Sequence, residues 1–501
     1  MPTFRNIFSR RFMSRFCHCD IASSCFLSTS IHGGFSCLFL AGAMIALFSI
    51  ATVKMLIIAV GIGIVFWLLR KKFHTLLHSL DSLSLHPTMS ICFVVFIGLI
   101  LRLLFYYVHI GTEIEAFQTG DCLIFLNEAK EMASGSFPET KSWITIGCYA
   151  LMIKVFGESL LLLCILNIIM QIVCVILLYF LAHKMFGPLE ALLASMAFFW
   201  SPNFVTLAFY LYIEHFAYPL VLFQFLLLYH WTEKKNIFYP ITMGLVTLIT
   251  LWTKPDAGIF LMVIMGFVVL MNVIISYNTL KKTALGGGII LGVIVLGLFC
   301  SYSINVKYHG SHTCLCSEDG LWPQYFGANY ANQGKAKIED KLALYDKYRN
   351  KTGQPLEFRD NHCPSVLVPY IKDEIHRRWS SMSLKEKIHH IYNKESFSWQ
   401  IVWNPQYSTE LIAKFHTIFK VCIWLAACMS LLILSFRSIV SPIINSIDIL
   451  RALPILYLIG MFLCIILVES NYRYTTCANI FYPIFFGHFL CWLKNTYKPQ
   501  N

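Results

Sequence analysis

Charged residues are scarce in this sequence. Asp, Glu, Lys and Arg make up 13% of its 501 residues, whereas hydrophobic residues make up 57%. Soluble domains have about 25% charged and about 45–50% apolar residues, so the composition excludes an ordinary soluble protein. Many Trp and Tyr lie near the ends of apolar runs, as in membrane proteins. We therefore expect an all-α polytopic membrane protein with about 10–12 transmembrane helices and one external domain before the last three spans.

Acidic residues are fewer than basic ones, and the net charge is +12. A basic chain can indicate nucleic-acid binding. Here, however, most Lys and Arg lie at the ends of apolar runs, where the positive-inside rule places them. The charge therefore indicates orientation in a membrane, with membrane lipids and no nucleic acid as partners.

Cysteines in polar surroundings are also few. Of 18 Cys, most lie inside apolar segments, where they behave as small hydrophobic residues. Cys314 and Cys316 lie in a polar segment, but no His or Cys pair stands at the matching metal-ligand spacing. The sequence therefore gives no support for a divalent metal or another resident cofactor.

The N-terminus lacks the pattern of a cleavable signal, because a polar stretch separates its arginines from the first apolar run. That run, 37–69, is about 33 residues long, too long for one span of about 20 and short for two, and we interpret it as a hairpin. The predicted divisions are a cytoplasmic basic arm (1–35), an N-terminal helical hairpin and cytoplasmic loop (36–88), a membrane core (89–306) with an external loop (111–142), an external soluble domain (307–410), and C-terminal membrane helices (411–501).

Basic residues recur at every second junction between the predicted spans. Lys184, Lys234 and Lys281 lie at such junctions, which the positive-inside rule places in the cytoplasm. The loop 111–142 and the segment 307–410 are then external. We expect a multi-pass protein of the plasma or inner membrane whose site faces the external or periplasmic side. The predicted spans after the loop are 158–182, 187–202, 204–231, 237–252, 256–277, 284–306, 411–436, 449–469 and 474–493.

Ionisable residues near membrane depth are rare and usually functional. Carboxylates beside cations suit a reaction in which a base deprotonates an acceptor while cations hold a phosphate leaving group. The candidates are Glu113, Glu115 and Asp121 in the first external loop, Glu214 and His215 in the span 204–231, Lys254 at a span junction, Glu469 and Arg473 in the last external turn, and Arg102 in the span 89–110.

Several candidates have a purely structural alternative. Asp121 is placed to cap a helix that starts at Cys122. Glu214 and His215 suit an internal hydrogen-bonded pair that joins two spans. Lys254 can extend its ammonium to the interface, as long cationic side chains do.

The order and spacing of several segments between residues 89 and 493 resemble the GT-C superfamily of multispanning membrane glycosyltransferases. This superfamily includes the protein O-mannosyltransferases and the lipid A aminoarabinose transferases. The segments that carry the resemblance are GDCLIFLNEAKEMASG, IKVFGESLLLLCILN, FFWSPNFVTLAFYLYIEHFAYPL, LITLWTKPDAGIF and VESNYRYTTCANIFYPIFF.

The resemblance implies a membrane helix bundle, a catalytic first external loop and a polyprenyl-phosphate sugar as donor. It implies Asp121 as the catalytic acid of the loop and Glu214 as the acidic residue of a later span. Lys254 would correspond to the basic residue before Pro, and Arg473 to the phosphate-contacting arginine. Arg473 also has a possible local salt-bridge partner in Glu469.

Two positions depart from the family pattern. Relatives often carry an acid nearer the end of the first span, where this sequence has Glu113 and Glu115, so the choice of catalytic base stays open among these and Asp121. Lys254 stands where many relatives have Arg, and Lys lacks the bidentate guanidinium fork.

The sequence therefore favours a glycosyltransferase of hexosyl or pentosyl type acting on a lipid, glycan or protein acceptor. An O-antigen polymerase or ligase is the alternative, and it would depend on basic residues of the long loop such as Arg377 and Arg378. A lipid-linked sugar transporter or flippase is a further alternative, although such proteins are often built from repeats and no convincing repeat occurs here.

Overall fold

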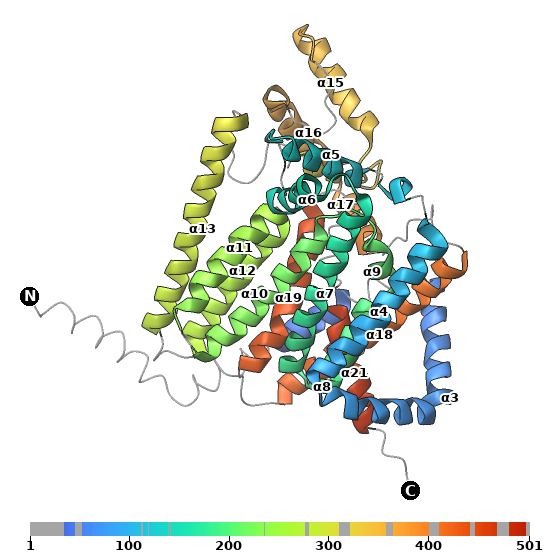
Figure 1. The fold of residues 1–501 in the computed structure, drawn as a ribbon. Helices are drawn as coiled ribbons and strands as arrows, with labels where there is room; N and C mark the ends of the chain where they lie inside the picture. The colour runs from blue at the N-terminus through green and yellow to red at the C-terminus, as the bar shows by residue number, and fades with distance from the viewer. Residues whose placement is uncertain are drawn as a thin grey trace, which may run out of the picture.

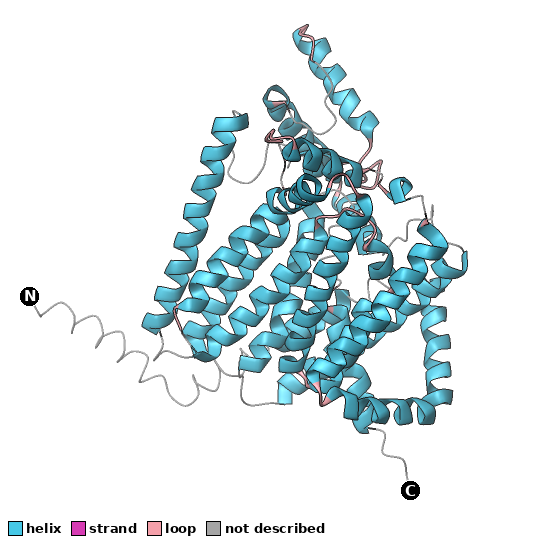
Figure 2. Cartoon of the chain, viewed as in Figure 1, coloured by secondary structure: helices cyan, strands magenta, loops and turns pink. Residues whose placement is uncertain are grey.

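The described residues form helices and loops, and no strand occurs among them (Figure 2). The structure is a computed structural model. It describes residues 35–45, 53–111, 114–118, 120–138, 140, 142–234, 236–275, 280–309, 321–356, 364–399, 410–440, 446–467 and 480–496.

Five helices of the described chain are long and apolar enough to cross a membrane, which confirms the prediction of an all-α polytopic membrane protein. Shorter apolar helices and the Pro-containing α10 (Glu214–Lys234) pack among them. The five are α4 (Pro87–Phe105, continued by a π-helical turn to Ile110), α7 (Leu160–Met185), α13 (Leu280–His309), α18 (Glu410–Val440) and α19 (Ser446–Leu467). The shorter ones include α6 (Trp143–Phe156), α8 (Pro188–Phe199) and α11 (Phe238–Thr253), and the apolar α12 (Pro255–Ile275) follows α11.

The first long helix extends beyond its predicted end. The predicted hairpin ends at residue 69, but α3 (Val53–Ser84) continues through Arg70 to Ser84. Residues 70–84 contain no Gly or Pro, so nothing local ends the helix until Pro87, which begins α4. Residues 46–52, within the predicted hairpin, lie outside the described residues.

The two ends of the helix bundle differ (Figure 1). At one end, which we call the loop end, lie α5 (Asp121–Ala133), α6 and the helices of the long polar segment. At the opposite end lie the beginning of α8 and the end of α21 (Tyr482–Thr496). The polar segment contains α14 (Leu321–Gly327), α15 (Ile338–Thr352), α16 (Val368–Ser381) and α17 (Leu384–Trp399).

The polar segment has an aromatic cluster of its own, separate from the bundle core. Trp322, Tyr325 and Tyr345 are each at most 4% exposed and lie in this cluster with side chains from α14, α15 and α16. Its last helix, α17, packs on α19 of the bundle. A separate small core supports the proposal that residues 307–410 form a domain, and the packing of α17 attaches it at the loop end.

Close packing of α8 against α21 depends on a glycine. A Cβ added at Gly487 would meet the backbone oxygen of Glu190 and lie 3.2 Å from the backbone nitrogen of Ala194. Backbone atoms cannot rotate away as a flexible side chain can. Close approach of two helix backbones through small residues is the usual solution in membranes, where lipid supplies no hydrophobic driving force between helices.

Replacing Gly487 by Ala should therefore destabilise the protein by about 1–3 kcal/mol, as overpacking of a tight interface does. The measurement is reversible unfolding in mixed detergent micelles. Gly266→Ala in α12 is the matched control, because no atom lies within 4 Å of its added Cβ. Equal stability of the two variants would contradict this packing.

Candidate functional site

The span predicted at 204–231 is interrupted in the structure. A short helix, α9 (Pro202–Leu207), ends at Leu207, and α10 begins only at Glu214. The prediction of one continuous span is therefore corrected to two helices joined by residues 208–213. Glu214 lies in the first turn of α10 rather than three turns into a span. Backbone groups freed by such a break need other partners, because hydrocarbon offers none.

Side-chain amides supply many of these partners. Gln118 Nε2 donates to the backbone oxygen of Phe209 at 2.8 Å, and its Oε1 accepts from the backbone nitrogen of Leu211 at 3.3 Å. Asn167 Nδ2 donates to the backbone oxygen of Tyr210 at 2.9 Å. Gln118 and Asn167 are themselves buried, at 5% and 0% exposure. The loop before α5 and the helix α7 therefore jointly hold the break open.

Arg102 and His215 support the other side of the break. Gln171 Nε2 donates to the backbone oxygen of Phe204 at 3.0 Å, and its Oε1 accepts from Arg102 Nε at 3.1 Å. His215 Nε2 donates to the backbone oxygen of Leu207 at 2.8 Å. The other donors of Arg102 reach backbone oxygens of α4, α8 and α9. Both side chains thus have structural partners, and substrate binding by either one stays a prediction.

A buried ionic cluster forms where α10 begins. Lys254 Nζ lies 3.1 Å from Glu214 Oε1 and 3.6 Å from Asp256 Oδ2. The Lys254 and Glu214 side chains are each 5% exposed. Lys254 caps the end of α11, and Pro255 begins α12, which turns the chain at this point. Lys254 is therefore buried in an ion pair rather than extended to the interface, and Glu214 pairs with it instead of with His215.

The first turn of α5 lies close to this cluster. Cys122 is fully buried, hydrogen bonds to Tyr212 and the backbone of Leu211, and experiences the charge of Glu214. Burial raises the pKa of the Cys122 thiol to about 12, so this thiol stays protonated and is a poor nucleophile. Asp121 precedes it in the chain and is exposed.

Asp121 is not the N-cap of α5. The N-cap is Gly120, with φ 57°, and the helix begins at Asp121 rather than at the predicted Cys122. A carboxylate in the first turn still interacts favourably with the helix dipole. The Asp121 side chain is exposed, and its catalytic role stays a prediction.

One of the four remaining candidates lies within the described residues, and three lie outside them. Glu115 is exposed in a short 3₁₀ helix, Ile114–Phe117, at the loop end. Glu113, Glu469 and Arg473 lie outside the described residues. The structure therefore joins Glu214 to Lys254 and places Asp121 beside the adjoining Cys122, while the roles of all these residues stay predictions.

Two buried charges of α17 were missed in the sequence. Lys394 Nζ donates to the backbone oxygens of Gly327, at 3.0 Å, and Ile466, at 2.9 Å, which lie at the ends of α14 and α19. Glu395 is 1% exposed. The thiol of Cys464 in α19 interacts electrostatically with Lys394 and Glu395 and also with Lys254 and Asp256.

The long polar segment therefore contributes charged groups to the vicinity of the ionic cluster. A cation at two helix C-termini stabilises their free carbonyl groups. The signal in the sequence was a Lys-Glu pair within an amphipathic stretch, which solvent exposure would also explain.

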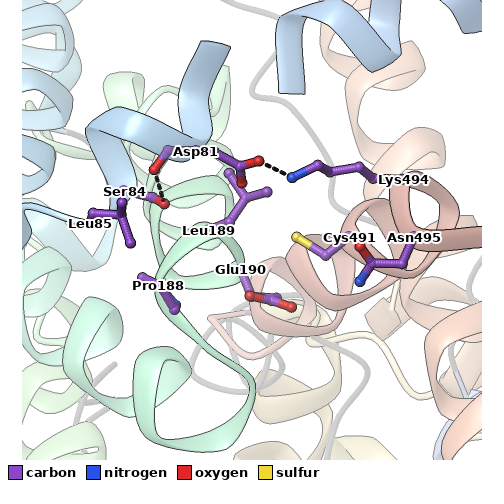
Figure 3. A pocket seen from close by; sticks show the side chains of 9 residues that line it. All are labelled: Asp81, Ser84, Leu85, Pro188, Leu189, Glu190, Cys491, Lys494 and Asn495. Atoms are coloured by element: carbon purple, nitrogen blue, oxygen red, sulfur yellow. Dashed lines mark hydrogen bonds and ion pairs between the residues drawn. The ribbon is translucent and has the colours of Figure 1, made fainter. Parts of the chain in front are cut away.

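A pocket lies at the opposite end of the bundle and contains none of the predicted site residues (Figure 3). It has a volume of about 360 Å³ between the ends of α3 and α21 and the beginning of α8. Lys494 forms an ion pair with Asp81 across it. Among the described residues, no group of three His, Cys, Asp or Glu side chains is arranged to hold a metal ion.

The buried pair should be energetically coupled. Lys254→Met leaves two carboxylates without their ammonium and should cost about 3–5 kcal/mol in unfolding free energy. Glu214→Gln should cost less, because Lys254 keeps Asp256 as a partner. The double variant should cost less than the sum, because it leaves a smaller uncompensated charge. Reversible unfolding in micelles measures all three, and simple additivity would show that the two groups do not interact.

The part of the chain that contains the ionic cluster is similar to a known protein family. Residues 142–299 match the family model described as dolichyl-phosphate-mannose-protein mannosyltransferase. A search of curated proteins finds no significant match.

One solved structure is similar in fold, with a TM-score of 0.48 and 12% identity: the archaeal oligosaccharyltransferase AglB from Archaeoglobus fulgidus, in complex with an inhibitory peptide and a dolichol-phosphate. The alignment covers 83% of this chain and 52% of that chain, so this chain spans about half of its length. Over residues 142–299, which contain Glu214 and Lys254, the family match confirms the resemblance to the GT-C mannosyltransferases.

Proposed function

We propose that the protein is a membrane glycosyltransferase that moves one sugar from a polyprenyl-phosphate donor to a lipid, glycan or protein acceptor. The observation that carries the proposal is the position of the buried Glu214–Lys254 pair. It lies within the segment 142–299 that matches the mannosyltransferase family and next to the first turn of α5. A buried ion pair at the end of a membrane helix is costly without a function.

In the proposed reaction, the acceptor hydroxyl attacks the anomeric carbon of the donor sugar. The bond from that carbon to the phosphate oxygen breaks, and the phosphate leaves with the electron pair. Asp121 takes the hydroxyl proton, and one in-line displacement inverts the anomeric centre. Glu115 and Glu113 are the alternative bases, and Arg473 is the proposed phosphate contact.

The ionic cluster has a more specific role in this proposal. Lys254 is shared between Glu214 and Asp256, so two carboxylates face one ammonium. Such a group suits hydroxyl groups of a sugar, which donate hydrogen bonds to carboxylates. We assign Glu214 and Lys254 to orienting the donor sugar and place the reaction on the external or periplasmic side, by the distribution of basic residues.

The alternative of an O-antigen polymerase or ligase has less support. Its expected basic residues, Arg377 and Arg378, both bind Glu374. The hydrogen bond from Arg377 is the main cause that lowers the pKa of Glu374 to about 2, so this carboxylate stays ionised. Arg378 also donates to Tyr325. These contacts give the two arginines a structural use within the polar segment.

The catalytic role of Asp121 is tested by transfer from a panel of polyprenyl-phosphate sugars to lipid acceptors by the purified protein. Asp121→Asn should lower kcat by about 10²–10⁴, the usual loss when a general base is removed. Glu131→Gln, an exposed acid on the same helix, is the control and should keep full activity. Full activity of Asp121→Asn with a loss in Glu115→Gln would move the base to Glu115.

A further inference from the structure

Four Lys or Arg side chains are buried in the described part of the chain: Arg102, Lys254, Lys394 and Lys420. The first three donate to oxygen atoms of the protein, either carboxylates, a side-chain amide or backbone carbonyls. Lys420 differs. It is 5% exposed, and among the described residues its one contact for the charge is the ring of Trp424, with Nζ 4.3 Å from the ring centroid.

A buried ammonium with an aromatic ring alone is poorly compensated. Removing an ammonium ion from water costs more free energy than a desolvated cation–π contact returns. Ionisable groups inside membrane helices that face the protein usually mark a binding site. No anionic group of the described chain therefore compensates the charge of Lys420.

Aromatic rings line one side of Lys420. The residue lies in α18 (Glu410–Val440), ten residues after the start of the helix. Trp424, one turn further, packs on Tyr482 of α21 with ring centroids 5.3 Å apart. The ammonium is thus buried within the bundle, beside two rings that pack on each other.

The helix that carries Lys420 also contacts the interrupted segment. α18 contacts α9, and the chain runs from the end of α9 at Leu207 directly to Glu214. Figure 1 shows α9 and α17 close to the loop end. α18, which carries Lys420, therefore packs on the first part of the interrupted segment, and Glu214 of the ionic cluster begins its second part.

We propose that Lys420 binds the phosphate group of the polyprenyl-phosphate donor, above Trp424 and between α18 and α21. This inference rests on the proposed function and adds Lys420 to Arg473 as a phosphate contact, while Lys254 stays assigned to the sugar. Lys254 already has two carboxylate partners, whereas Lys420 has none in the described chain. The acidic cluster then faces the sugar and Lys420 faces the phosphate.

Binding is tested with the purified full chain and three probes: a polyprenyl monophosphate, the matching polyprenol, and inorganic phosphate. The wild type should bind the polyprenyl monophosphate and not the polyprenol. Lys420→Met should weaken that binding by about 10- to 100-fold, the equivalent of one charge-assisted hydrogen bond, and Lys420→Arg should retain most of it. Phosphatidylglycerol, as a fourth probe, separates a specific polyprenyl site from general headgroup binding. Equal affinity of the wild type for phosphatidylglycerol and for the polyprenyl monophosphate would overturn the proposal.

Unfolding without lipid provides a second, independent measurement. Replacing an uncompensated buried charge by an apolar side chain should stabilise the protein, so Lys420→Met should have a higher unfolding midpoint than the wild type. Lys307→Met is the matched control, since Lys307 lies 5.1 Å from the Tyr308 ring but is exposed. A lower midpoint for Lys420→Met with unchanged lipid binding would show that Lys420 only packs on Trp424.

The two proposals fail in different ways. If Lys420→Met transfers sugar with an unchanged KM for the donor, the assignment of Lys420 is wrong and the glycosyltransferase function stands. If Lys420 is needed for binding polyprenyl monophosphate but no donor supports transfer, the site stands and the transferase function is wrong.

Discussion

The interruption between α9 and α10 is the constraint on which the rest of the site depends. Backbone groups in a membrane must find partners within the protein, so a break is stable only where polar side chains reach it. Four side chains do so here: Gln118 from the loop before α5, Asn167 and Gln171 from α7, and His215 from α10. The break ends at Glu214 and thereby brings this carboxylate to a helix N-terminus in contact with Lys254.

The distribution of charge follows from this arrangement. Glu214 and Asp256 compensate Lys254, while Arg102 is bound by an amide and by backbone oxygens. The buried cations of the described chain therefore stabilise the fold, apart from Lys420, whose charge faces an aromatic ring. A site with an acidic part for a sugar and an uncompensated cation for a phosphate matches the two ends of a sugar-phosphate donor.

Much of the fold could be predicted from apolar run length. The predicted spans at 158–182 and 284–306 correspond to α7 and α13, because long uncharged runs form helices in a membrane whatever their neighbours. The extent of α3 was underestimated, since charged residues that end a span do not end a helix. The break within 204–231 was not predicted, because the side chains that stabilise it come from distant parts of the sequence.

The site was predicted in part for the same reason. Glu214 and Lys254 were identified one by one as ionisable groups in apolar surroundings, but their pairing is a tertiary contact across 40 positions of sequence. Asp121 was placed one residue from its true position in α5, since Gly120 takes the cap. Lys420 was overlooked, although it lies nine residues inside the predicted span 411–436.

The most direct test of the account is a cryo-electron microscopy structure of the purified protein with a polyprenyl-phosphate sugar. The account predicts density for the phosphate at the loop end, near Lys420, and for the sugar near Glu214. Density for the lipid phosphate in the pocket of Figure 3, beside Lys494 and Glu190 at the opposite end of the bundle, would contradict it.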